Sequence, residues 1–417
     1  MLNACVYKYL YQYLLTIFSR TPALMAHTTE VYHLWSEFSN PASPAHGWDN
    51  MIQHILSSKD KTIIVLAAEE WDLQDFQNPE LKENPELIQQ LISQAERHCE
   101  INNVTVHIVS GRYSNWRPAP SDCPITEQVS SPWHSFNTHL WGTFWFYMGI
   151  LRYKNPQNAS IRHLYDNSQV PTRPHFVCYI NRPHPYRCYL MDQFARTGII
   201  SDNLISFLMM PAEMGASYQF KHWQPQQLAI PGEQAIANNY EQISDFQWCS
   251  ESPQYRDTLF DVVPESGVAS EFITEKTVLP ILKCRPFVVV GCAGFHQRLA
   301  DLGFELFPEL FDYGFDTLSD SRQRIDNIVA QLQHINTWSS HTVAEVYHQL
   351  RPACERNVRR LFELVQSGEG IPDILEQQQS VIRPVNNMVD LNYYTHIEYV
   401  REMAGHNLDI IQELGFC

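Results

Sequence analysis

The sequence has 417 residues, 44% of them hydrophobic and 12% aromatic, which is enough to bury sizeable cores and excludes wholesale disorder. At roughly 100–200 residues per domain, this length favours two domains. Lysine and arginine number 29 against 46 aspartate and glutamate, so the formal net charge is −17. Such an acidic chain is a poor general partner for nucleic acid or an anionic membrane, and an anionic ligand would need a local basic island.

The N-terminal stretch 5–18 is apolar and aromatic, and we expect residues 1–25 to form a first helix or an extension, with Met25 as an alternative start. Lys8 interrupts the run, which is shorter than the roughly 20 residues needed to span a bilayer. We therefore expect a soluble, cytoplasmic protein without stable membrane insertion, with a membrane-associated N-terminal segment as the open alternative. The ten cysteines form no CxxC pair and no zinc-spaced cluster, so we expect no metal site.

Residues 60–110 have the pattern of a β-α-β unit. TIIVLAA (62–68) is a continuous apolar run, typical of a strand that is buried on both faces. Asn84 and Pro85 predict a helix start, with Asn as the cap and Pro at the first helical position. VTVHIVSG (104–111) predicts the next strand. This alternation predicts a parallel sheet with helices on its faces.

A second α/β series follows the polar segment 154–174, which is a candidate bridge between two domains. Helices are expected near 187–198, 274–283, 295–302 and 320–335, and over much of 341–417. The expected strands are FVCYI (176–180), LISFLMM (204–210), FDVV (260–263) and PFVVV (286–290). The fold class predicted from the whole pattern is α/β.

The stretch 167–191 holds no acidic residue but contains Arg173, Arg182 and Arg187. The turn NRPHPYR (181–187) follows a predicted strand, so it lies at the carboxyl end of the sheet, where open α/β folds bind ligands. The helix that opens there adds N–H groups and a positive dipole end. Guanidinium groups at this place suit a diphosphate through bidentate hydrogen bonds, and a solvated basic loop is the alternative.

A second cluster, VVPESGVASEFITEKT (262–277), also follows a strand and opens into a helix. Glu265 ends the strand, and Glu275 and Lys276 fall in the first turn of the helix. An acid can bridge both hydroxyls of a ribose, and a lysine supplies a compact positive charge beside a diphosphate. The spacing alone is equally compatible with Glu275 as a helix cap and Lys276 as a solvated side chain.

A third strand leads into Gly291 and Gly294, which permit close backbone approach to a ligand. The sequence has no GxxxxGK[ST] and no GxGxxG motif, so the P-loop and standard dinucleotide-binding interpretations lose their main support. It also lacks an Asp-x-Asp pair that would hold a divalent metal against a diphosphate at this place.

Taken together, residues 176–207 and 260–316 resemble the C-terminal half of fucosyltransferase-like glycosyltransferases, including viral and environmental versions. The most specific part is the order strand, PES, six residues, ITEK, helix, PFVVVG, GF, within a resemblance that covers roughly 174–335. The resemblance implies a GT-B architecture, in which two Rossmann-like domains face a cleft. The implied parts are an acceptor domain (26–165), a nucleotide-sugar domain (172–340) and helices that pack across the junction (341–417).

The resemblance implies an inverting, metal-independent glycosyltransferase that uses no cofactor and moves a sugar, fucose among the candidates, to a glycan acceptor. Glu275 looks like the ribose ligand, and Lys276 with an arginine, Arg187 before Arg182, looks like the diphosphate contact. The resemblance favours a GDP-sugar as donor. Ser266 and Phe272 depart from the family pattern, which has an asparagine and an aromatic hydroxyl there, and these departures weaken the match to GDP-fucose, so the nucleotide and the sugar stay open. The implied donor-binding residues are Arg182, Arg187, Glu265, Ser266, Phe272, Thr274, Glu275, Lys276, Gly291 and Gly294.

Inverting transfer needs a base within reach of the acceptor hydroxyl, and the implied architecture takes it from the N-terminal domain. Glu70, with Glu69 next, is the expected base, because both follow the strand TIIVLAA. The alternative bases are Asp72, His134 and His139. Three tryptophans are candidates for stacking on acceptor sugar rings, with core packing as the alternative: Trp133, Trp141 and Trp145. The rival functions are a non-catalytic nucleotide- or carbohydrate-binding protein of the same fold and a phosphoryl-transfer enzyme, for which the Gly-rich loop is missing.

Overall fold

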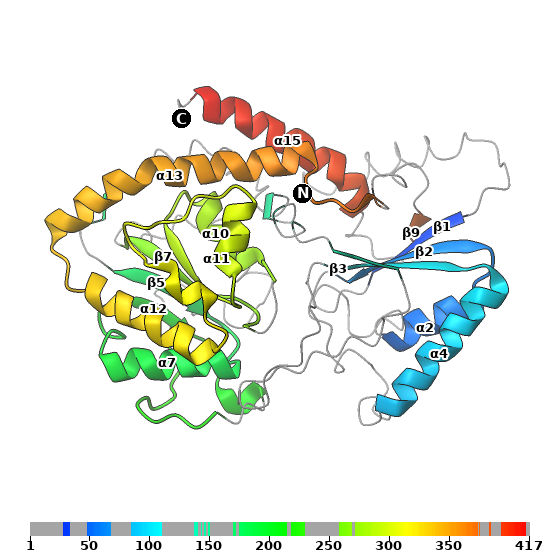
Figure 1. The fold of residues 1–417 in the computed structure, drawn as a ribbon, viewed down its shortest axis with the longest axis horizontal. Helices are drawn as coiled ribbons and strands as arrows, with labels where there is room; N and C mark the ends of the chain where they lie inside the picture. The colour runs from blue at the N-terminus through cyan, green and yellow to red at the C-terminus, as the bar shows by residue number, and fades with distance from the viewer. Residues whose placement is uncertain are drawn as a thin grey trace, which may run out of the picture.

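The computed structural model contains two separate parallel β-sheets, each flanked by helices (Figure 1). Among the described residues, no helix is both long enough and apolar enough to cross a membrane. The predicted α/β fold class is confirmed in this coarse form, because every strand pairing within the two sheets is parallel. The structure describes residues 28–33, 48–67, 85–110, 137–140, 143, 146, 149–150, 170–171, 175–214, 218–229, 258–268, 272–373, 375, 383–384 and 393–413.

The first sheet has the strand order β4-β3-β2-β1-β9. Its β-α-β unit is confirmed, because β2 and β3 pair in parallel on either side of α4, the helix that begins at the predicted Pro85. The sequence analysis did not find β1, β4, β9 or the helix α2. The element bounds are β1 (Thr28–His33), α2 (Trp48–Ser57), β2 (Lys61–Ala67), α4 (Pro85–Asn102), β3 (Thr105–Ser110), β4 (Asn137–Leu140) and β9 (Arg383–Pro384).

Strand β2 is buried on both faces, as its apolar run predicts. Ile63 and Val65 pack in one hydrophobic cluster with residues of α2 and α4. Ile64 points to the other face and belongs to the cluster that continues into the second sheet. All three side chains are fully buried, and each such burial stabilises the fold by about 1.5–3 kcal/mol.

The second sheet has the strand order β6-β5-β7-β8, and all four of its strands fall on predicted runs. Figure 1 shows α7 and α12 on one face of this sheet and α10 and α13 on the other. The strand bounds are β5 (Phe176–Ile180), β6 (Leu204–Phe207), β7 (Phe260–Pro264) and β8 (Phe287–Val290). The helix bounds are α7 (Pro185–Thr197), α10 (Glu275–Leu282), α11 (Phe295–Asp301), α12 (Ser321–Ile335) and α13 (Ser340–Ser367), with 3₁₀ turns η2 (Pro211–Met214) and η3 (Tyr313–Thr317).

Helix α7 shows how local signals set its ends. Pro185 occupies its first turn, and Gly198 ends it in the left-handed conformation at φ 76°. The amide of Gly198 donates to the carbonyl of Ala195, and the amide of Ile199 donates to the carbonyl of Phe194. The predicted helix with Gly198 past its end is therefore confirmed.

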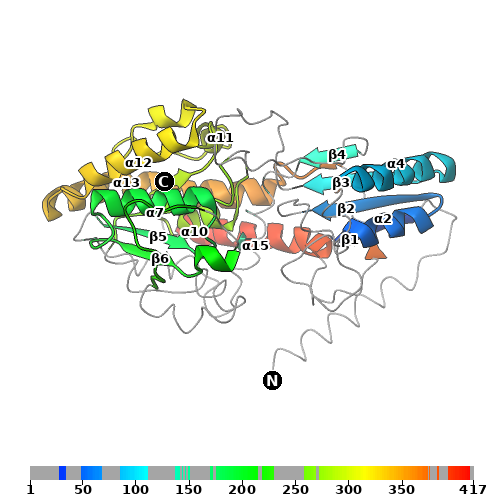
Figure 2. The same ribbon diagram turned by 90° about the horizontal axis from the view of Figure 1, so that it is seen from below.

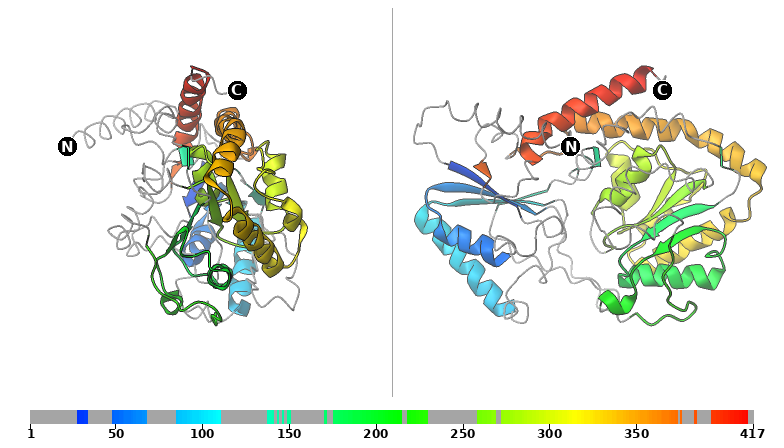
Figure 3. Two further views of the ribbon diagram at one scale, coloured as in Figure 1. Left: turned by 90° about the vertical axis from the view of Figure 1, so that its left-hand side faces the viewer. Right: turned by 180° about the vertical axis from the view of Figure 1, so that it is seen from behind.

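The C-terminal part of the chain contacts both sheets. Helix α13 packs on α10 beside the second sheet, and β9 then adds a short parallel strand to β1 in the first sheet. Helix α15 (Tyr393–Glu413) runs side by side with α13 (Figure 3). In Figure 2 the arrowheads of β2 and β3 point toward the part of the molecule that holds the second sheet.

Candidate functional site

The strand order of the second sheet marks the boundary between its two central strands as a candidate ligand site. Strand β5 connects outward to β6 through α7, whereas β7 connects in the opposite direction to β8 through α10. The boundary between β5 and β7 is therefore a topological switch point, and open α/β sheets bind ligands beyond the carboxyl ends of the strands that flank it. The segment 181–187 follows β5, and the described residues 264–268 and 272–276 follow β7. Hydrogen bonds from Arg187 to the carbonyls of Pro264 and Glu265 bring the two segments together.

The turn after β7 is organised around the carboxylate of Glu265, which is fully buried. One oxygen accepts hydrogen bonds from the Thr274 amide, at 3.0 Å, and from the Thr277 hydroxyl. The other accepts from the Ser266 amide at 3.0 Å and from the Thr274 hydroxyl at 2.5 Å. A buried carboxylate is stable only with such partners, and here four donors satisfy it.

Lys276 brings a cation to the same turn. Its Nζ donates to the Glu275 carboxylate at 2.6 Å, to the Ser266 hydroxyl at 3.1 Å and to the Thr274 hydroxyl at 3.5 Å. The Thr274 hydroxyl also caps α10, because it accepts from the Lys276 amide at 3.3 Å. The side chains of Lys276 and Glu275 are 29% and 23% exposed, so both are within reach of a ligand.

Arg187, the arginine expected first as a diphosphate contact, is buried and bonds to the protein backbone. Arg187 is only 3% exposed, and its guanidinium donates to the backbone carbonyls of Arg182, Pro264 and Glu265 at 3.2, 3.0 and 2.7 Å. These bonds tie α7 to the end of β7 across 78 residues of sequence. Arg182 is half-buried, which makes it the more accessible of the two arginines that were expected to contact a diphosphate.

The turn after β8 is closed by the protein itself. The carboxylate of Asp316 accepts from the amides of His296 and Gln297 at the start of α11, and from Nδ1 of His296 at 2.8 Å. The Gly294 amide donates to the Asp316 carbonyl at 2.8 Å. The positive end of α11 therefore already has its anionic partner.

The two glycines of this turn have structural reasons of their own, which differ from the expected approach of a ligand. A Cβ at Gly291 would lie 2.8 Å from the ring of Phe295, so close packing requires glycine there. Gly294 has φ 79° and open space around it, so its conformation requires glycine. Phe272 and Thr274 are also buried, and they hold the turn rather than face solvent.

Several expected residues lie outside the described part of the chain. The base candidates Glu69, Glu70 and Asp72 are among them, as are His134, Arg173 and the three tryptophans of the acceptor hypothesis. His139 falls in β4. Their roles stay predictions.

Two buried charged residues that were not predicted hold segments around the second sheet in place. Arg324 of α12 donates to the carbonyls of Val268 and Gly291, which joins the turns after β7 and β8. Asp192 of α7 accepts from the amides of Lys221, His222 and Trp223, and so holds the segment after η2 against the helix. Neither residue belongs to a local motif, so no pattern in the sequence indicated them.

Burial shifts the pKa of two groups inside the second sheet. It raises the pKa of the Cys178 thiol, so this predicted buried cysteine is an inert core residue. It also raises the pKa of Asp261 on β7, even though Arg285 donates to this carboxylate at 2.6 Å. Neither group is part of the turn that holds Lys276.

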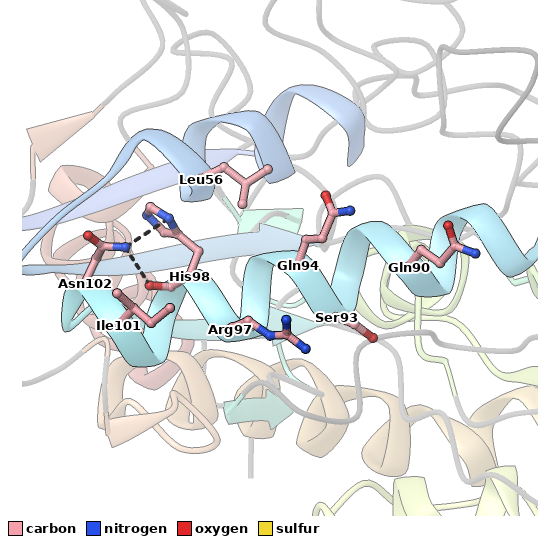
Figure 4. Close-up of a pocket in the computed structure, with 8 residues that line it drawn as sticks. All are labelled: Leu56, Gln90, Ser93, Gln94, Arg97, His98, Ile101 and Asn102. Carbon is pink, nitrogen blue, oxygen red and sulfur yellow. Dashed lines mark hydrogen bonds between the residues drawn. The ribbon is translucent and has the colours of Figure 1, made fainter.

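A surface pocket lies elsewhere, along α4 and the end of α2 (Figure 4). Arg97, His98 and Asn102 line it together with Leu56 and the exposed Ile101. His98 bonds to the carbonyl of Ser58 and to Asn102, so its ring has a structural role. In the part of the chain that the structure describes, no three His, Cys, Asp or Glu side chains are grouped to hold a metal ion.

Comparison of the chain with protein-family models, with curated proteins and with solved structures found no match.

Proposed function

We propose that the chain is a glycosyltransferase of GT-B architecture, which moves a sugar from a nucleoside-diphosphate donor to a glycan acceptor. The observation that carries this proposal is the meeting of segments 181–187 and 264–276 at the topological switch point of the second sheet. Both segments belong to the resemblance, and the second presents a partly exposed cation beside two hydroxyls.

The residues of the proposed site have two roles: some contact the donor, and others hold the turn in place. Lys276 and Ser266 are the proposed diphosphate contacts, with Arg182 as the accessible arginine, and Glu275 is the proposed ribose ligand. Arg187 supports the site from inside the fold, because it is buried and both of its terminal guanidinium nitrogens donate to backbone carbonyls. Positive charge at Lys276 stabilises the charge that develops on a departing diphosphate, which is the chemical step this turn can serve.

The acceptor side is assigned to residues 26–165, with 172–340 for the donor and 341–417 for the helices that link them. Glu70, or Glu69 beside it, is the proposed base that takes the proton of the acceptor hydroxyl. The proposal includes inversion at the anomeric carbon and no obligatory metal, both of which come from the resemblance.

The test measures binding and turnover together. Mass spectrometry follows consumption of GDP-, UDP-, dTDP- and CMP-sugars with a mixed glycan acceptor, and calorimetry measures the affinity for GDP and UDP. We expect turnover of one diphosphate donor, and a loss of about 1–3 kcal/mol of diphosphate binding in Lys276→Ala.

The matched control is Lys59→Ala, which removes the same charge from an exposed residue between α2 and β2 and should leave binding unchanged. Equal binding by Lys276→Ala and the native chain would refute the assignment of the site. Tight nucleotide binding without consumption of any donor would instead establish the non-catalytic binding protein.

A further inference from the structure

Glu265 has no surface with which to contact a donor, although the sequence analysis placed it among the donor-binding residues. Its side chain is fully buried, and its two oxygens accept four hydrogen bonds from Ser266, Thr274 and Thr277. A ribose hydroxyl could reach this carboxylate only if some of these donors lost their acceptor, which is costly inside a protein. The carboxylate therefore serves the turn itself.

The hydrogen bonds of Glu265 lead directly to Lys276. The Thr274 hydroxyl gives its single proton to Glu265, so its lone pairs are left for the Lys276 amide at 3.3 Å and for Nζ at 3.5 Å. The Ser266 amide is held by the same carboxylate, and the Ser266 hydroxyl accepts from Nζ at 3.1 Å. Both hydroxyls beside the ammonium group are thus oriented through Glu265.

The backbone of the turn is fixed from the opposite side. The Arg187 guanidinium, itself buried, donates to the carbonyls of Pro264 and Glu265 from helix α7. The Glu265 amide donates to the carbonyl of Val290 on β8. The main chain of Glu265 is therefore held by two neighbouring elements while its side chain holds the start of α10.

We infer that Glu265 is the positioning residue of the diphosphate site, which sets Lys276 and Ser266 in place without touching the donor. This inference rests on the proposed function, because it needs a diphosphate to be the ligand of Lys276. It distinguishes two roles for Glu265, contact with the ribose and positioning of Lys276, which the sequence alone does not separate. A ribose contact would act on nucleotides alone, whereas a residue that positions Lys276 acts on any diphosphate.

The test compares GDP with inorganic pyrophosphate, which carries no ribose, by calorimetry on the full chain. Glu265→Gln keeps the side-chain size but turns one acceptor oxygen into a donor NH₂ group that faces existing donors. We expect the affinity for both ligands to fall by the same factor, about tenfold or more. A fall for GDP with unchanged pyrophosphate binding would overturn the inference in favour of a ribose contact.

A double-mutant cycle separates positioning from general damage. In the Lys276→Ala background, Glu265→Gln should cause little further loss of pyrophosphate affinity, because the residue it positions is gone. Fully additive losses would contradict the inference. Asp261→Asn is the matched control, since it alters a buried acid inside β7, and pyrophosphate affinity should stay unchanged in it.

A milder variant covers the case in which Glu265→Gln fails to fold. Thr277→Val removes a single buried donor to Glu265 at similar volume, and we expect it to weaken both ligands equally, by about two- to fivefold. Unchanged binding in Thr277→Val would then count against the inference. A native chain that binds neither ligand would refute the proposed function itself, whereas native binding with additive variants refutes only the role of Glu265.

Discussion

The turns after β7 and β8 have similar surroundings but differ in where a buried carboxylate bonds. Each follows a short, fully buried strand and leads into a helix, and a buried carboxylate bonds to the start of each helix or to the turn before it: Glu265 from the turn itself after β7, and Asp316 from η3 after β8. After β8, Asp316 sits on the helix N-terminus itself and bonds to His296 and Gln297. After β7, Glu265 bonds to the Ser266 amide, to the N-cap Thr274 and to the hydroxyl of Thr277, and the first turn of the helix keeps a partly exposed Lys276.

The difference shows how one sheet edge can hold both a structural turn and a candidate binding turn. An acid placed on a helix N-terminus uses up the positive end of that helix. Glu265, which precedes the helix in the chain, instead orients the hydroxyls of Ser266 and Thr274 and leaves Lys276 accessible. The position of the buried carboxylate, rather than the presence of glycine, thus distinguishes the two turns.

The largest expected effect comes from removing the acid of the closed turn. Asp316→Ala leaves the buried amide and ring donors of His296 without an acceptor, and we expect the free energy of unfolding to fall by about 3–5 kcal/mol. Urea denaturation measures this change. Asp312→Ala, which removes an exposed acid from the same segment, should cost about 1 kcal/mol. A loss of pyrophosphate binding in folded Asp316→Ala would contradict the division between the turns.

The second effect is the pH dependence of stability. Burial alone would raise the pKa of Asp316, but hydrogen bonds from His296 and Gln297 outweigh it and lower the pKa. Asp316 therefore contributes its full stability above an unfolded-state pKa of about 3.9, and the contribution is lost as the pH falls through the lower folded-state pKa.

Urea denaturation between pH 3 and pH 6 measures this dependence. We expect Asp316→Asn to flatten the loss of stability at the acid end of this range. Asp261 has the opposite sign, because its raised pKa makes stability fall as the pH rises through it, so Asp261→Asn should steepen the net rise of stability with pH. The same slope in all three proteins would contradict both assignments.

The smallest effects concern the glycines of the closed turn. Gly291→Ala forces a Cβ against the buried ring of Phe295, and we expect a loss of about 1–3 kcal/mol. Gly294→Ala meets no neighbour but strains a left-handed residue, which costs about 1 kcal/mol. Gly198→Ala is the matched control, with the same conformation and the same open space. Thermal unfolding that ranks Gly294→Ala below Gly291→Ala in stability would contradict this reasoning.

Much of the second sheet could be predicted because its signals are local. Runs such as FVCYI and PFVVV are continuous and β-branched, and Pro185 and Gly198 mark the ends of α7. Strand β9 could not be predicted, since two residues carry no period and their pairing with β1 depends on the folded chain. The sequences of strands β1 and β4 mix polar and apolar residues without clear alternation, so they gave no strand signal.

The location of the candidate site could be predicted from the sequence, but not which of its charged residues are accessible and which are buried supports. The order of strands and turns placed the segments of Arg187, Glu265 and Lys276 at one edge. Whether a charged side chain points into the fold or out of it depends on partners far away in sequence, such as the carbonyl groups that Arg187 finds 77 and 78 residues further on. Motif reasoning treated all three as ligands for that reason.

The pairing of β9 with β1 has a consequence for biosynthesis. Strand β1 ends at His33, whereas its neighbour begins at Arg383, so the ribosome must add roughly 350 residues before β9 can pair with Glu30 and Val31 at this edge of the first sheet. At about 5–20 residues per second, the interval lasts about 20–70 s. During this time a nascent β1 that has already paired with β2 presents an open strand edge, to which other chains can pair. Chaperone demand should therefore fall sharply once the last tenth of the chain has emerged.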